Sequence, residues 1–192
     1  VAWLDKWPDW PGQFMLLTGP MGCGKTHLTH VWGTRSEAAK INGDDLISMD
    51  ISALNTLTQG NVILEDIGKG VDEKKLFHLY NLIKENGTFL LMTSRSNIPE
   101  WEIKLPDLMS RLGAIQIARI GEPDDVLFAS ILLKSFSDKQ IQVTPDVVQY
   151  LVTRLERSFA AALSIVSALD NLSLAEKRKI TIPLVKSVLD NA

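Results

Sequence analysis

Up to about residue 120, the chain alternates between short apolar runs and longer segments with helical spacing. The runs are almost continuously apolar, which is typical of parallel strands covered by helices on both faces. The predicted strands are Gln13–Thr18, Ala38–Ile41, Asn61–Asp66, Thr88–Thr93 and Ala114–Ile120, of which Ala38–Ile41 is the weakest. This alternation predicts a parallel sheet with right-handed crossovers and a ligand site at the carboxyl ends of its strands.

After Gly121 the pattern becomes helical throughout. The predicted helices are Asp124–Ser137, Pro145–Leu155, Ser158–Leu172 and Pro183–Leu189. The change in pattern predicts two domains, an α/β domain over residues 1–121 and a small all-α lid over residues 122–192.

The charge balance argues against direct binding to DNA. The 192 residues include 20 Lys and Arg against 23 Asp and Glu, a formal net charge of -3. Binding to a phosphate backbone usually needs a basic surface, so no direct sequence-specific DNA binding is expected. The chain has one cysteine, Cys23. No apolar run approaches the length of a membrane span, roughly 18 residues. These features predict a cytoplasmic protein without a disulfide and without membrane contact.

The strongest chemical signal is Gly19–Thr26, which matches the phosphate-binding pattern G-x-x-x-x-G-K-[ST]. It follows a predicted strand and opens a helical stretch, a context that a ligand-free glycine turn does not explain. Glycines let successive N–H groups face a phosphate, and the helix end adds positive potential. We expect Lys25 to reach the β- and γ-phosphates of ATP or ADP and the Thr26 hydroxyl to bind Mg²⁺. The predicted nucleotide-contacting residues of this segment are Gly19, Pro20, Met21, Gly22, Cys23, Gly24, Lys25, Thr26 and His27.

A second signal is Val62–Asp66, an apolar strand that ends in two carboxylates, the form of a Walker B motif. Because the carboxyl ends of parallel strands share one edge, Glu65 and Asp66 should face the phosphate loop. Glu65 is predicted to bind Mg²⁺ together with Thr26, and Asp66 to polarise an attacking water. Adjacent acids are also common in turns, so the pair alone is weak evidence for a Walker B motif. The phosphate loop upstream makes this interpretation strong.

The predicted strand Thr88–Thr93 runs out into polar residues. Ser94, at its tip, is predicted to hold the attacking water or the γ-phosphate. The alternative, in which Ser94 only caps the turn before Pro99, stays open.

Together these elements resemble an AAA+ ATPase module, and the local sequence resembles the replication initiator DnaA and its relatives. Gly19–Leu28 with His30 resembles their GKTHL-x-H stretch. Leu64–Ile67 resembles their Walker B motif, and Leu91–Arg95 their sensor 1 strand. Leu105–Leu112 resembles the box that carries an arginine finger, especially in Hda-type DnaA homologues. The resemblance covers nearly the whole chain.

The resemblance implies a regulator rather than an initiator. No helix-turn-helix domain follows the lid, and Asn42–Gly60 is too short for the extra helical hairpin that initiators use for DNA and filament assembly. Hda-type relatives act with the DNA-loaded sliding clamp to stimulate hydrolysis of ATP bound to DnaA. The implied partners are therefore DnaA and the sliding clamp, the latter through a segment expected upstream of Val1. A homodimer is left open.

The resemblance also gives roles to two arginines. Arg111 would be the arginine finger, acting in trans on ATP bound to DnaA, with a plain helix-capping arginine as the alternative. The family's sensor 2 arginine aligns with Ala160, and Arg157 is predicted to contact the nucleotide in its place, with a solvated arginine near the helix start as the alternative. The order Glu65–Asp66 reverses the usual Asp–Glu of ring-forming ATPases. Together with Ala160 it predicts slow ATP hydrolysis, so an enzymatic activity of the chain's own is left open.

Two other functions stay open. A helicase loader of the same family would bind single-stranded DNA and the replicative helicase, but the acidic balance and the short Asn42–Gly60 stretch count against it. A small-molecule kinase would need an acceptor site and would not explain Leu105–Leu112.

Overall fold

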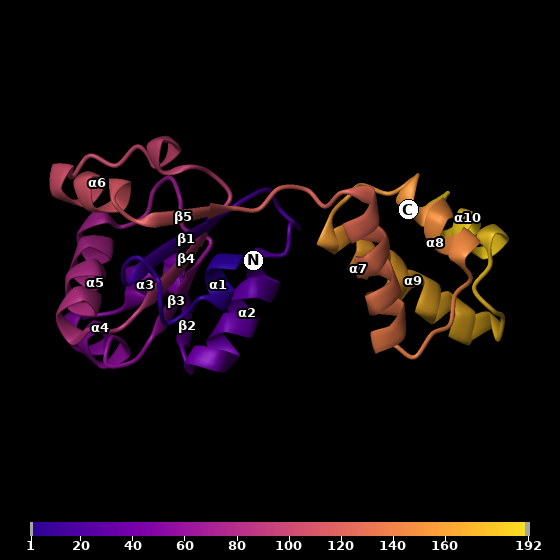
Figure 1. Ribbon diagram of the computed structural model, residues 1–192, viewed down its shortest axis with the longest axis horizontal. Helices are drawn as coiled ribbons and strands as arrows, with labels where there is room; N and C mark the ends of the chain where they lie inside the picture. Colours follow the sequence, from indigo (N-terminus) through magenta and orange to yellow (C-terminus); the bar gives the residue numbers. More distant parts are fainter. Residues whose placement is uncertain (1, 191–192) are drawn as a thin grey trace. The chain divides into compact units, whose positions relative to one another are not determined.

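The computed structural model describes residues 2–190 (Figure 1). They form two compact units. The first comprises the residues up to Pro20 together with Lys25–Ile120, and the second comprises Met21–Gly24 together with the residues from Gly121 onward.

A five-stranded parallel sheet lies at the centre of the first unit, within the residues described. Its strands are β1 (Phe14–Thr18), β2 (Ala39–Asn42), β3 (Val62–Glu65), β4 (Leu90–Ser94) and β5 (Gln116–Arg119), in the spatial order β2-β3-β4-β1-β5. The α/β fold class and the predicted strands are confirmed, with strand ends that differ by one or two residues.

Helices cover both faces of this sheet (Figure 1). They are α1 (Ala2–Asp5), α2 (Lys25–Ser36), α3 (Gly43–Ser48), α4 (Ile51–Leu57), α5 (Glu73–Asn86), the 3-10 helix η1 (Ile98–Trp101) and α6 (Pro106–Gly113). The first two helices pack on one face of the sheet, and the others contribute to the core on the opposite face.

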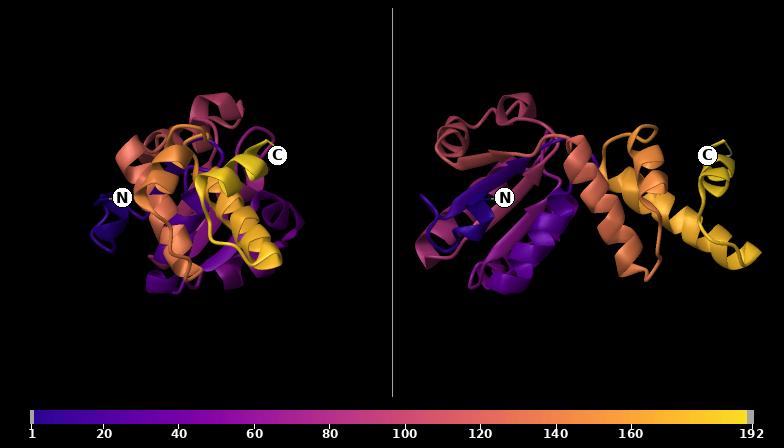
Figure 2. Two further views of the ribbon diagram at one scale, coloured as in Figure 1. Left: turned by 90° about the vertical axis from the view of Figure 1, so that its right-hand side faces the viewer. Right: turned by 45° about the vertical axis from the view of Figure 1, so that its right-hand side comes forward.

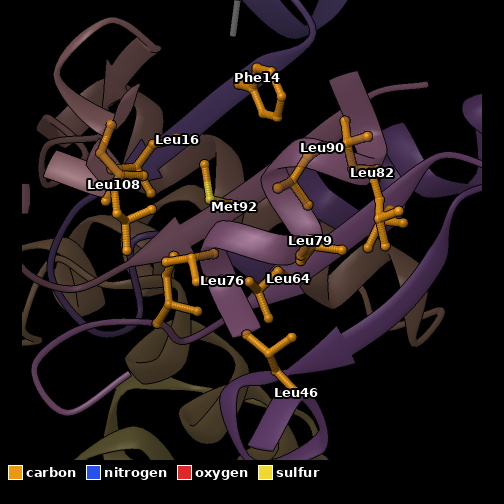
Figure 3. Packing of buried hydrophobic residues seen from close by; sticks show 14 of the residues in the cluster. Phe14, Leu16, Leu46, Leu64, Leu76, Leu79, Leu82, Leu90, Met92 and Leu108 are labelled. Atoms are coloured by element: carbon orange, nitrogen blue, oxygen red, sulfur yellow. The ribbon is translucent and has the colours of Figure 1, made fainter. Parts of the chain in front are cut away.

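Successive strand residues point to opposite faces of the sheet, which explains why the central strands β1, β3 and β4 are apolar along most of their length. Leu16, Leu64 and Met92 belong to the core beneath α5 (Figure 3). Their neighbours Leu17 and Ile63 belong to the core beneath α2. The central strands β1, β3 and β4 therefore contact helices on both faces of the sheet.

The capping chemistry of α5 matches its sequence signals. Asp72 accepts a hydrogen bond from the Lys75 N–H at the start of the helix. Gly87, with a φ of 71°, ends the helix in the left-handed conformation that glycine adopts without strain.

The stretch Asn42–Gly60, for which the sequence analysis predicts no helix, contains the short helices α3 and α4. Asn42 and Asp45 form a reciprocal capping box that starts α3. Asp50 accepts from the Ala53 N–H to start α4. These caps were present in the sequence, but each helix is too short to show a clear apolar period.

The second unit contains the helices α7 (Asp125–Asp138), α8 (Pro145–Val152), α9 (Phe159–Glu176) and α10 (Ile182–Leu189). Both α8 and α9 pack against α7 and against α10 (Figure 2). The predicted lid helices are confirmed, and α9 extends four residues beyond its predicted end at Leu172.

By length and composition alone, α9 is apolar enough to cross a membrane, which the sequence analysis overlooked. Ala162, Ile165, Val166 and Leu169 of this helix are buried in the core of the second unit. Buried residues make up 22% of the helix, and length and composition alone are weak evidence for a membrane span.

The assigned core makes a stability prediction. Leu64→Ala should lower the free energy of unfolding by about 2–5 kcal/mol, because it leaves a cavity between β3 and α5. Leu64 is fully buried, whereas Ile51 on α4 is 65% exposed. Ile51→Ala is therefore the control, with an expected change within about 0.5 kcal/mol. Urea titration followed by circular dichroism measures both, and equal losses would contradict the assigned core.

Candidate nucleotide site

The strand order brings the predicted loop, sensor and acidic residues to one edge of the sheet. β4 lies between β1 and β3, and Thr18 at the end of β1 is aligned with Ser94 at the end of β4. Glu65 ends β3. The Gly19 N–H donates to the Ser94 carbonyl at 3.3 Å, which connects the start of the phosphate loop to β4.

The phosphate loop has the backbone and the lysine that anion binding requires. Gly22 and Gly24 adopt φ values of 75° and 94°, which glycine tolerates and other residues rarely adopt. The buried Lys25 donates from Nζ to the carbonyl oxygens of Gly19 at 2.7 Å and Pro20 at 2.8 Å. Since α2 begins at Lys25, its N-terminus, which carries partial positive charge, adjoins the loop. A phosphate bound here would meet a positioned ammonium group and a helix N-terminus.

Four other predicted contact residues differ in exposure. Thr26 and His27 follow Lys25 in the first turn of α2 and are exposed, as is Met21. Cys23 is buried.

The loop tip Met21–Gly24 belongs to the second compact unit, together with the start of α9. There the Phe159 N–H donates to the Gly22 carbonyl at 2.6 Å. A Cβ atom placed on Gly22 would lie 3.0 Å from the Cβ of Ala160. Ala160, the position aligned with sensor 2, thus lies beside the loop tip, where a small residue fits.

Arg157 makes a contact that the sequence analysis does not anticipate. Its Nη2 lies 2.6 Å from Oδ1 of Asp125, the first residue of α7. Both side chains are about half exposed. Its predicted contact with nucleotide would require this ion pair to open.

The two acids of the Walker B motif have separate partners. Glu65 is buried, and its Oε1 accepts from the hydroxyl of Thr29, while its Oε2 lies 2.7 Å from Nζ of Lys40. Asp66 is exposed, with a φ of 53°, and its Oδ1 lies 3.6 Å from Nε of Arg95. Each acid therefore faces a basic side chain.

This arrangement does not fit the Mg²⁺ site predicted from Thr26 and Glu65. Mg²⁺ requires oxygen ligands in near-octahedral geometry. Both Glu65 oxygens are instead engaged, one by Thr29, three residues beyond Thr26 on α2, and one by an ammonium group. Among residues 2–190 there is no cluster of three or more His, Cys, Asp or Glu side chains that could hold a metal.

Ser94 is fully buried at the tip of β4. Its hydroxyl oxygen accepts from the Ser96 N–H and from the Trp101 indole N–H, each at 3.2 Å. The contact with Ser96 matches the turn-capping alternative. It does not exclude the sensor role, because Ser94 is the acceptor in both bonds and a hydroxyl also carries one donor.

Arg111 lies in the last turn of α6 and packs against α5. Its guanidinium donates to Oδ1 of Asn81 and lies over the rings of Phe77, at 4.4 Å from the centroid, and Tyr80, at 5.3 Å. Burial raises the pKa of Tyr80 above its ordinary 10.0, and the positive charge of Arg111 acts in the opposite direction. Arg111 is thus half-buried against its own fold, whereas the sequence analysis expects it at a subunit edge.

The side chains that hold these groups were missed by sequence reasoning. Lys40 and Thr29 hold Glu65, Asn81 holds Arg111, and Trp101 holds Ser94. Lys40 could have been found, since a predicted β2 paired in parallel with β3 places it on the same face as the acid. The contact of Asn81 with Arg111 joins residues 30 positions apart on two helices, and no local pattern signals it.

Comparison with known proteins assigns the family. The profile of the family described as Hda, lid domain, matches residues 128–189. A protein of Haemophilus influenzae, itself described as uncharacterised, is 30% identical over 196 residues, which cover 95% of this chain and 84% of the relative.

Solved structures share the fold at low identity. Domain III of the replication initiation protein DnaA from Thermotoga maritima is similar with a TM-score of 0.81 at 16% identity, over 94% of this chain and 85% of that one. AMPPCP-bound DnaA from Aquifex aeolicus is similar with a TM-score of 0.69 at 16% identity, over 81% of this chain and 55% of that one. A RuvB mutant from Thermotoga maritima reaches a TM-score of 0.75 at 16% identity, over 93% and 62%. With the lid match and the motifs above, these findings show that the chain belongs to the DnaA-related, Hda-type AAA+ proteins.

Proposed function

We propose that this AAA+ protein regulates replication initiation by placing Arg111 on ATP bound to a DnaA-type initiator, with the sliding clamp as second partner. It binds ATP or ADP in its own phosphate loop and hydrolyses ATP slowly. We place this activity in the cytoplasm.

Nucleotide binding is supported by the loop itself. The buried Lys25 is held by the carbonyl oxygens of Gly19 and Pro20 at the start of α2, which positions its ammonium group for an anion. The positive φ values of Gly22 and Gly24 are the backbone conformations that such loops use to face N–H groups toward a phosphate. Nucleotide-bound DnaA among the structures of the same fold supports the same proposal.

Slow hydrolysis is supported by the state of the two acids. A base that polarises water needs a carboxylate directed at that water. Asp66 lies near Arg95, and Glu65 is held by Thr29 and Lys40. Neither acid is positioned as a general base in this arrangement.

The position of Arg111 carries the proposal of action in trans. Arg111 lies over Tyr80, whose ring stacks on Phe14 at 3.8 Å between centroids. Phe14 begins β1, whereas Thr18 ends it and leads to the phosphate loop. The two ends of this strand are about 13 Å apart at roughly 3.3 Å per residue. Arg111 thus lies toward the edge of the sheet opposite the loop, so a phosphate it serves belongs to another chain.

Magnitudes indicate that the contacts of Arg111 within its own fold do not prevent this role. One hydrogen bond from the charged guanidinium contributes about 1.5–3 kcal/mol, and each of its two half-exposed cation–π contacts about 0.5–1 kcal/mol. Release therefore costs on the order of 2–5 kcal/mol. An arginine finger contributes roughly a thousandfold to a hundred-thousandfold in rate, or about 4–7 kcal/mol. The gain is comparable to the cost of release or larger.

Nucleotide binding is tested at Lys25. Lys25→Ala should weaken binding of a fluorescent ADP analogue by roughly tenfold to a hundredfold, because a charge-assisted hydrogen bond is lost. Lys84→Ala, an exposed lysine of α5, is the control and should bind as the wild type does. Fluorescence anisotropy titrations measure both affinities. Equal affinities in the two variants would argue against the assigned loop.

The regulatory role is tested at Arg111. Arg111→Ala should abolish stimulation of ATP hydrolysis by DnaA in the presence of clamp-loaded DNA, while nucleotide binding persists. Arg154→Ala is a matched control, because Arg154 also stacks on a ring, that of Tyr150 at 3.8 Å, but lies in the second unit. The release of inorganic phosphate measures stimulation.

Undiminished stimulation by Arg111→Ala would rule out the arginine-finger role. If the wild-type protein gives no stimulation and instead binds single-stranded DNA with strong salt dependence, the helicase-loader alternative takes its place.

A further inference from the structure

The two acids that should attract a metal ion are already balanced by the chain's own cations. Glu65 lies 2.7 Å from the Lys40 ammonium, and Asp66 lies 3.6 Å from the Arg95 guanidinium. In P-loop proteins the charge of the phosphates is usually shared between the loop lysine and Mg²⁺. Here each carboxylate is paired with a cation of the chain, which weakens its attraction for a divalent ion.

The backbone sets the contact between Lys40 and Glu65. In the parallel pairing of β2 with β3, Asn42 is aligned with Glu65 and Lys40 with Ile63. Residues two apart in a strand share a face, so Lys40 and Glu65 both lie on the face covered by α2. The Lys40 side chain extends along this face to reach the carboxylate.

Thr29 fixes the other carboxylate oxygen. Thr29 is fully buried on α2, and its hydroxyl bonds to Oε1 of Glu65. A buried hydroxyl and a buried carboxylate that satisfy one another are costly to separate. Turning Glu65 toward a metal ion near Thr26 would break this bond and the ion pair with Lys40 together.

We propose that this protein binds its nucleotide with little dependence on Mg²⁺, because Lys40 occupies the Walker B carboxylate that would otherwise attract the ion. The inference rests on the proposed binding of ATP or ADP in the phosphate loop and adds how the charge of that ligand is balanced. Lys40 acts through Glu65 and is a positioning residue. Its removal should restore the dependence on Mg²⁺.

The experiment compares the affinity for a fluorescent ADP analogue in excess MgCl₂ and in excess EDTA. The wild type should bind equally in both to within about threefold, below the range of ordinary coupling between two ligands. In Lys40→Met, Mg²⁺ should strengthen binding by about tenfold, an ordinary coupling, because Glu65 is no longer paired with an ammonium group.

Lys69→Met is the matched control. Lys69 pairs with Glu102 at 2.6 Å, a similar but exposed ion pair, so this variant should keep the wild-type ratio. A second readout uses Mn²⁺ as the probe. The electron paramagnetic resonance signal of free Mn²⁺ should fall further with Lys40→Met and ADP than with the wild type and ADP. Circular dichroism checks that both variants are folded.

Each outcome decides the inference. A wild-type affinity that falls tenfold or more without Mg²⁺ overturns it and leaves nucleotide binding intact. A ratio and a Mn²⁺ signal that do not change in Lys40→Met overturn the role of this lysine. Absence of nucleotide binding in both buffers overturns the proposed nucleotide site, and this inference with it.

Discussion

The parallel register of β3, β4 and β1 is the constraint on which the rest of the site depends. It aligns Ser94 with Thr18 and places the end of β3 two strands from the phosphate loop. The register is held by apolar residues that alternate between two helical layers, such as Leu16 toward α5 and Leu17 toward α2. A slip of one residue would exchange the two sets and would move Ser94 out of alignment with Thr18. The packing of the sheet therefore fixes where the chemistry lies.

Charge compensation is the basis of the proposed slow hydrolysis. Lys25 is engaged by loop carbonyls, while Glu65 and Asp66 each face a cation. Phosphate binding needs only the lysine and the loop backbone, but water activation needs a carboxylate directed at the water. Lys25 is held in the loop, whereas Glu65 and Asp66 are each paired with a basic side chain. Under the proposed function, the chain holds its own nucleotide and acts on that of another protein.

The sequence predicted most of the fold because the responsible signals are local. Apolar runs marked the strands, and the glycines with Lys25 marked the phosphate loop. The helices α3 and α4 escaped because they are too short to show a period. The contacts of Glu65 with Lys40 and of Arg111 with Asn81 could not be predicted in the same way. They depend on strand pairing, helix packing and rotamers, which bring together residues 25 and 30 positions apart.

If the protein hydrolyses its bound ATP slowly, the nucleotide has a role other than supplying energy. A ligand that binds only the folded state stabilises it by RT ln(1 + [L]/Kd), about 2.7 kcal/mol at a hundredfold excess over Kd. The loop starts beside Ser94 and leads into α2, whose buried Trp32 and Thr29 contact the core and Glu65. Nucleotide bound at the loop would therefore also stabilise the sheet on which α5 and α6 pack. Since Arg111 lies on α6 and packs against α5, a nucleotide in the loop would stabilise the elements that hold this arginine without contacting it. Under the proposed function, the nucleotide bound to this chain is therefore a structural ligand, and the nucleotide that is hydrolysed is the one bound to the DnaA-type initiator.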